Sequence, residues 1–238
     1  MLKQIIIENR YCGPPDSGHG GYTCGRLANF IKGGAEVTLR RPPPLNKELS
    51  VKIQKDGRAV LYDTNGDIAE ATSTTLELDV PRPPTFMEAQ SSVTNTDELQ
   101  NHYFPTCFTC GPHREKNDGL RIFPGPVYGK NYIAAPWIPS SNLCDDTGKV
   151  KNEVIWAALD CPSGWAILLE QMRFMLLGRL TVNVEERMKP GNKCIVIGWK
   201  MSSEGRKIYS GSAVFSESGI LYAKAKATWI ELKSSALS

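Results

Sequence analysis

The stretch "AVFSESGILYAKAKATWIEL", residues 213–232, reads as a second copy of "AVLYDTNGDIAEATSTTLEL", residues 59–78. The preceding segments match as well, because "RLTVNVEERMKPGNKCIVIG" at 179–198 follows the pattern of "EVTLRRPPPLNKELSVKI" at 36–53. Internal repetition of this kind decides the architecture of a whole chain. The sequence therefore predicts one structural unit present twice.

The spacing between the copies is not constant. Asn46 and Asn192 are 146 residues apart, whereas Gly66 and Gly219 are 153 apart. The offset grows between the two anchors, so we expect a longer hairpin there in the second copy, at a turn where insertions are tolerated.

Each copy contains strands that follow a helical segment. The end of the second copy alternates with a period of two, which is typical of a strand with one buried face: Leu221, Ala223, Ala225, Ala227 and Trp229 share that face. Turn pairs such as Asn65-Gly66 and Ser218-Gly219 separate the strands as hairpins require. Helical spacing marks residues 20–31 and 163–177, and the second of these is apolar nearly all round, so a sheet must enclose it.

These patterns predict an α+β fold of two fused units, each a central helix wrapped by an antiparallel sheet. The boundaries expected from composition are 1–85 for the N-terminal unit, 86–103 for a polar, proline-bounded linker, and 104–238 for the C-terminal unit.

Composition narrows the classes of function. The 238 residues carry 28 basic and 25 acidic side chains, scattered along the chain, which disfavours nucleic acid as a partner. No apolar run reaches the length of about 20 residues that a membrane span needs. Seven irregularly spaced cysteines and no apolar leader indicate reduced thiols in a cytoplasmic protein.

Three motifs sharpen this interpretation: "CFTCGP" at 107–112, "DGLRIFPGPV" at 118–127 and "WAALDCPSGWA" at 156–166. Together with the order of elements, they resemble a bacterial group within the double hotdog architecture of the thioesterase and dehydratase superfamily. The resemblance covers roughly residues 104–232, and the repeat extends it to the first half. The resemblance indicates the fold more strongly than it indicates an activity.

The resemblance implies an acyl-thioester substrate, with coenzyme A as part of it and no separate cofactor, bound between the two units. It places the thioester carbonyl at a helix start, where unpaired N–H groups stabilise the oxyanion. The residues expected to open the two helices and bind substrate are Gly20, Gly21 and Tyr22 in the first, and Ser163, Gly164 and Trp165 in the second.

Asp160, in the motif "WAALDCPSGWA", is the leading candidate for a catalytic general base that activates water. A buried carboxylate is costly unless it is paired or hydrogen-bonded, so the alternative is that Asp160 merely caps its own helix. Asp16 and His19, in "DSGHGG", are further catalytic candidates, although this stretch departs from the family motif Asp-x-x-Gly-His-x-Asn-Asn by lacking one residue and both asparagines.

Two other functions stay open: a dehydratase or hydratase pairing His19 with an acid such as Glu170, and a non-catalytic acyl-CoA-binding module. A homodimer or higher homo-oligomer is also compatible with the sequence. The segment from His102 to His113 contains the pair Cys107 and Cys110, but no second distant pair of ligands is evident, so we expect no metal there.

Overall fold

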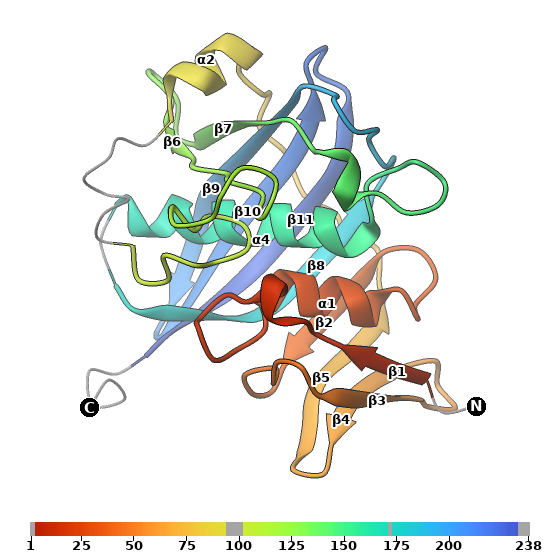
Figure 1. Ribbon diagram of the computed structural model, residues 1–238. Coiled ribbons are helices and arrows are strands. Elements are labelled where there is room, and N and C mark those ends of the chain that lie inside the picture. Colours follow the sequence, from red (N-terminus) through yellow and green to blue (C-terminus); the bar gives the residue numbers. More distant parts are fainter. Residues whose placement is uncertain (1–2, 94–101, 171–172, 233–238) are drawn as a thin grey trace.

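The computed structural model describes residues 3–93, 102–170 and 173–232. Its strands form one eleven-stranded antiparallel sheet in the order β1-β3-β4-β5-β2-β8-β11-β10-β9-β7-β6 (Figure 1). The first five strands in the chain fill one side of this order and the last six fill the other. The elements of the first half are β1 (Lys3–Ile6), α1 (Gly20–Ala28), β2 (Ala35–Leu39), β3 (Glu48–Ile53), β4 (Ala59–Asp63) and β5 (Gly66–Ser73), with a 3-10 turn at Asn9–Tyr11.

The second half repeats this plan with longer strands. Strands β9 and β10 contain 11 and 10 residues, against 6 and 5 for β3 and β4, so the longer hairpin expected from the growing offset is confirmed. The elements are β6 (Gly125–Pro126), β7 (Ile133–Trp137), α4 (Asn152–Leu168), β8 (Met175–Val184), β9 (Cys194–Glu204), β10 (Lys207–Ser216) and β11 (Leu221–Glu231), with a 3-10 turn at Ser141–Leu143.

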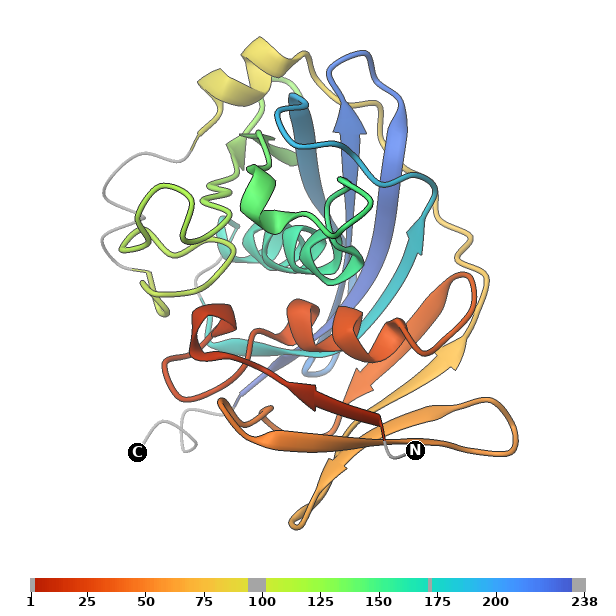
Figure 2. The same cartoon turned by 45° about the vertical axis from the view of Figure 1, so that its right-hand side comes forward.

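The two halves join where β2 pairs with β8, from Ala35 opposite Val182 to Thr38 opposite Arg179. This pairing makes the sheet continuous, and it hides two strand edges that would otherwise be open to other chains. Figures 1 and 2 show the sheet curving around α1 and α4, which lie side by side on the same face.

Glycines bring the two helices unusually close together. A Cβ atom on Gly21 would lie 2.5 Å from Asp160 Cβ, and one on Gly25 would lie 2.5 Å from Glu153 Cα. Because Gly21 and Gly25 lie one turn apart on the same face of α1, this face can pack directly on the backbone of α4. The start of α1 therefore meets the middle of α4, and the helices run antiparallel.

One expectation about local structure is wrong. The second helix begins at Asn152 rather than near Ser163, and it continues through Pro162 to Leu168. The segment expected to be a linker, 86–103, begins with a short helix, α2 (Phe86–Ser91), which starts with a capping box between Thr85 and Glu88. Residues 94–101 of that segment lie outside the described residues. No helix in the described part of the chain is long and apolar enough to cross a membrane.

Candidate functional site

Asp160 lies in the middle of α4, where the residue is 3% exposed, and it faces the start of the other helix. Its Oδ2 accepts a hydrogen bond of 2.6 Å from the backbone N–H of Gly21. The carboxylate therefore satisfies one of the unpaired donors at the start of α1, 139 residues away in the chain. The alternative in which Asp160 caps its own helix is wrong, because Asp160 lies inside α4 and binds the start of α1 instead.

The second carboxylate oxygen has a different environment. Oδ1 of Asp160 is buried and has no hydrogen-bond partner among the described residues. Burial raises the pKa of Asp160 to about 6, even though the neighbouring His19 and the Gly21 N–H group both favour the ionised form. A buried acceptor without a partner is rare in folded proteins, and it marks a position that needs a structural or functional explanation.

His19 immediately precedes α1 and touches Asp160. Its Nδ1 lies 3.4 Å from Asp160 Oδ2 and 3.2 Å from the N–H group of Tyr22, while its Nε2 lies 3.2 Å from Cys161 Sγ. Burial lowers the pKa of His19, but the charges of Cys107 and Asp160 outweigh it and leave the pKa raised. The imidazole thus links a carboxylate on one side to thiols on the other.

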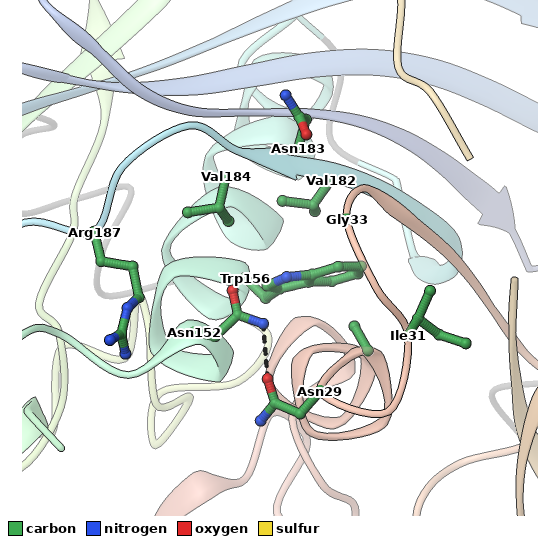
Figure 3. Close-up of a pocket in the computed structure, with 10 residues that line it drawn as sticks. Asn29, Ile31, Gly33, Asn152, Trp156, Val182, Asn183, Val184 and Arg187 are labelled. Atoms are coloured by element: carbon green, nitrogen blue, oxygen red, sulfur yellow. Dashed lines mark hydrogen bonds between the residues drawn. The ribbon is translucent and has the colours of Figure 1, made fainter. Parts of the chain in front are cut away.

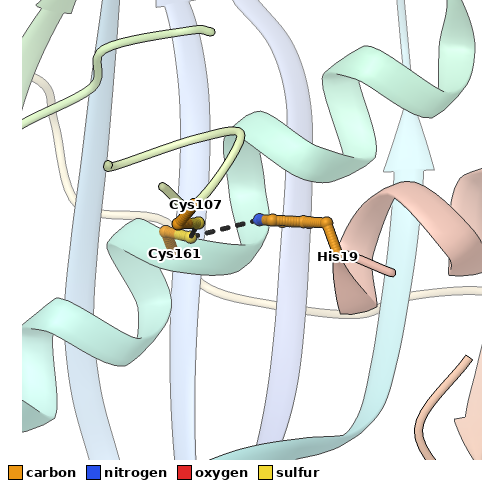
Figure 4. A group of neighbouring side chains, drawn as sticks. All are labelled: His19, Cys107 and Cys161. Carbon is orange, nitrogen blue, oxygen red and sulfur yellow. Dashed lines mark hydrogen bonds between the residues drawn. The ribbon is translucent and has the colours of Figure 1, made fainter. Parts of the chain in front are cut away.

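Cys107 and Cys161 lie beside this imidazole (Figure 4), and the thiol of Cys110 interacts with Cys107. Cys107 Sγ lies 3.6 Å from Cys161 Sγ, and hydrogen bonds from Cys110 and Cys161, together with His19, hold the pKa of Cys107 well below its usual range. We refer to these four residues as the Cys–His cluster: His19, Cys107, Cys110 and Cys161. All seven cysteines of the chain are free thiols in the structure.

The structure also corrects the expected oxyanion site. Ser163, Gly164 and Trp165 lie inside α4, so they do not open a helix. Ser163 instead donates its hydroxyl to the Asp160 carbonyl and accepts a bond from Trp229. Gly20 does open α1, but the N–H groups of the next two residues, Gly21 and Tyr22, are already bound to Asp160 and His19.

Two other predicted acids lie away from this site. Asp16 is exposed in the turn before His19. Glu170 is exposed and forms an ion pair with Lys200. The dehydratase hypothesis needed Glu170 and His19 at one cleft, and the structure does not bring them together.

An apolar pocket reaches the Cys–His cluster from the side of α4. It lies between the segment that begins at His102 and the second half of the helix, and Cys107, Cys110 and Cys161 form part of its wall. Gly164, one turn after Asp160 on the same helix face, also lines it. The other wall residues include Phe104, Trp165, Leu168, Met175 and Trp229.

A second pocket lies at the opposite end of the paired helices (Figure 3). It is formed where the end of α1, the start of α4 and strand β8 meet, with Trp156 as its apolar wall. Asn152 donates a hydrogen bond of 2.8 Å to Asn29 across the two helices. The true start of α4 therefore borders a cavity, although it lies far along the helix from Asp160.

Sequence reasoning missed two features of the site. Cys161 was not recognised as a partner of Cys107, because 54 residues separate them. The Gly-x-x-x-Gly spacing of Gly21 and Gly25 is a signal for close helix packing that the sequence contains. The prediction of no metal rested on a lack of further ligands, and that premise is wrong because Cys161 and His19 lie within 4.8 Å of Cys107.

Comparison with solved structures agrees with this architecture over the full chain. A provisionally named thioesterase from Novosphingobium aromaticivorans matches 97% of this chain and 95% of its own, with a TM-score of 0.62 and 11% identity. A protein provisionally named thioesterase II from Thermobifida fusca matches 97% and 92%, with a TM-score of 0.63 and 12% identity. The tesB protein of Mycobacterium avium subs paratuberculosis matches 93% and 90%, with a TM-score of 0.58 and 12% identity.

The chain has the double hotdog fold. No family model and no curated protein matches its sequence. At 11–12% identity the structural matches establish the arrangement of helices and sheet in this double hotdog, and its chemistry has to be argued from its own residues.

Proposed function

We propose that this double hotdog hydrolyses acyl thioesters of the coenzyme A type, with Asp160 as the general base. The observation that carries the proposal is that the two oxygens of the Asp160 carboxylate have different environments. Oδ2 is fixed by Gly21 N–H, whereas Oδ1 is buried without a partner among the described residues. A fixed, desolvated oxygen of this kind is suited to accepting a proton from a water molecule.

The proposed reaction uses the unpartnered oxygen of Asp160. Oδ1 of Asp160 takes a proton as water attacks the thioester carbonyl, the C–S bond then breaks, and the proton passes to the departing thiolate. The products are a carboxylic acid and a free thiol. The apolar pocket along α4, which contains Gly164 and Cys161 in its wall, has the lining that an acyl chain requires.

The experiment compares wild type and Asp160→Asn on a panel of acyl-CoAs, with detection of the released thiol. Asparagine retains an acceptor for Gly21 N–H, so the fold should persist. We expect turnover to fall by at least about tenfold and by up to about 10⁴-fold, the usual contribution of a general base. Asp67→Asn, which changes an exposed carboxylate on β5, is the matched control and should keep wild-type turnover.

A non-catalytic acyl-CoA-binding module is the second candidate. It is favoured by the 3% exposure of Asp160 and by the capping role of Oδ2. This alternative predicts that acyl-CoA binds to the wild type without hydrolysis. It also predicts that Asp160→Asn leaves binding unchanged, and an Asn variant that retains full hydrolysis would remove Asp160 from the chemistry.

A further inference from the structure

We propose that the Cys–His cluster is a binding site for one zinc ion, formed between the two hotdog units. Its members come from three separate parts of the chain: the loop before α1, the loop around residue 107, and the middle of α4. The proposal concerns metal binding and does not depend on whether the protein hydrolyses thioesters.

The spacing of the ligand atoms fits a tetrahedral centre. Zinc lies about 2.3 Å from thiolate sulfur and about 2.0 Å from imidazole nitrogen, so neighbouring ligands lie about 3.5–3.8 Å apart. The observed separations are 3.6 Å between Cys107 Sγ and Cys161 Sγ and 3.2 Å between His19 Nε2 and Cys161 Sγ. All three ligand atoms lie within 4.8 Å of one another. Small shifts therefore complete the coordination.

The proposal takes Cys110 as the fourth ligand. Its thiol interacts with Cys107 and Cys161, but it lies outside the group of three atoms that are within 4.8 Å of one another, so its side chain has to turn toward the ion. Cys110 follows Cys107 with the Cys-x-x-Cys spacing common to zinc-binding turns. The turn is closed by a hydrogen bond of 2.9 Å from Gly111 N–H to the carbonyl of Cys107. A Cβ atom on Gly111 would lie 2.5 Å from Cys107 N and O, so only glycine fits this turn. With three thiolates and one imidazole, the site is closed, as structural zinc sites are.

A second shell of hydrogen bonds is already in place. His102 accepts a bond of 2.9 Å from Phe104 N–H through Nδ1, so its Nε2 carries the proton and donates to Cys110 Sγ at 3.1 Å. On the other side, Asp160 Oδ2 lies 3.4 Å from His19 Nδ1. Carboxylates in this position orient ligating histidines in many zinc sites.

Binding has a defined consequence for His19. Its Nδ1 also lies within 3.2 Å of Tyr22 N–H, so the metal-free ring caps α1 through Nδ1 and directs Nε2–H toward the thiols. Ligation through Nε2 moves the ring proton to Nδ1, which then donates to Asp160 Oδ2 and no longer accepts from Tyr22 N–H. The thiols release their protons to solvent as the metal binds. The apolar pocket that reaches Cys107, Cys110 and Cys161 gives the ion a path to the site.

The first test uses the full-length wild type, purified without chelators and analysed for metals by mass spectrometry. We expect about one zinc ion per chain. After removal of zinc, Co²⁺ should give the thiolate charge-transfer and d–d absorption bands of a tetrahedral centre. A chain that contains iron or no metal, a Co²⁺ spectrum without thiolate bands, or a disulfide between Cys107 and Cys161 would overturn the proposal.

Variants test the ligand set. Cys161→Ser should lower zinc affinity by at least about tenfold, whereas Cys144→Ser, at a similarly half-buried thiol that contacts Ser140, should bind zinc like wild type. Asp160→Asn should weaken binding by about 10–100-fold, as loss of an outer-shell partner does. Circular dichroism checks folding, and if Cys161→Ser misfolds, the wild-type Co²⁺ spectrum decides. Equal affinity in wild type and a folded Cys161→Ser variant would contradict the assignment.

Discussion

At the scale of single residues, the contact between Asp160 and Gly21 explains why the chain buries a carboxylate. The absence of a side chain on Gly21 lets the two helix backbones approach, and the approach brings Asp160 Oδ2 to 2.6 Å from Gly21 N. A hydrogen bond to a charged group contributes about 1.5–3 kcal/mol, which offsets part of the cost of burial. The sequence indicated that Asp160 needs a partner, but nothing local to it identifies a residue 139 positions away.

Gly21→Ala tests this contact. Alanine would place Cβ 2.5 Å from Asp160 Cβ and 2.7 Å from the Trp156 carbonyl, so the helices must separate. We expect a loss of about 1–3 kcal/mol in the free energy of unfolding, the usual cost of overpacking, measured by urea denaturation. The control is Gly13→Ala, where the nearest atom would lie 3.4 Å away. A Gly21→Ala variant as stable as wild type would show that the helices are not held in contact here.

At the scale of elements, α4 shows where local signals mislead. The Pro-Ser-Gly sequence at 162–164 predicted a helix start, because proline favours the first turn and disrupts helix interiors. In the structure Pro162 lies inside the helix, Ser163 Oγ donates to the Asp160 carbonyl, and the Pro162 carbonyl packs against Gly198 of β9. Enclosure by the sheet thus overrides a local preference, and only the tertiary structure reveals it.

The paired strands β2 and β8 carry a second prediction. Glu36 on β2 accepts a bond of 3.0 Å from Thr181 and forms an ion pair of 3.3 Å with Arg179 on β8. Glu36→Lys should place two cations side by side at the junction of the units and lower stability by about 1 kcal/mol, more at low salt.

Thermal melts at two salt concentrations measure this effect. Adding Arg179→Glu to Glu36→Lys restores opposite charges and should recover most of the loss. Glu217→Lys, which breaks the exposed pair with Lys193 away from the junction, should cost less. Equal losses of melting temperature in Glu36→Lys and Glu217→Lys would show that the ion pair at the junction stabilises the protein no more than the exposed pair does.

At the scale of the whole molecule, the repeat predicted most of the fold. The period-two strands and their turn pairs indicated two meanders, and both lie in the sheet where the repeat placed them. The strands could be predicted because each alternation is local to its own residues. The Cys–His cluster could not, because it exists only after α1, α4 and the loop around Cys107 have come together.

The shared sheet and the helix contact also predict that the two units unfold together. All five tryptophans, at positions 137, 156, 165, 199 and 229, lie in the second unit, whereas the peptide signal of far-UV circular dichroism reports on both units. Because Trp156 packs beside Gly25 of α1, separation of the units changes its surroundings. We expect the fluorescence and dichroism transitions in urea to coincide, as two-state unfolding requires. A dichroism transition that precedes the fluorescence change would instead show that the first unit unfolds independently.

The joining of both units in one chain also removes a constraint of symmetry. If two identical copies built this sheet, a two-fold axis would require every contact at one helix start to occur again at the other. Here the start of α1 receives a buried acid from α4, while the start of α4 meets an asparagine of α1. A single polypeptide can therefore specialise one pole of the helix pair for buried charge and thiol chemistry, while an amide pair and the Arg26–Glu153 ion pair join the helices at the opposite pole.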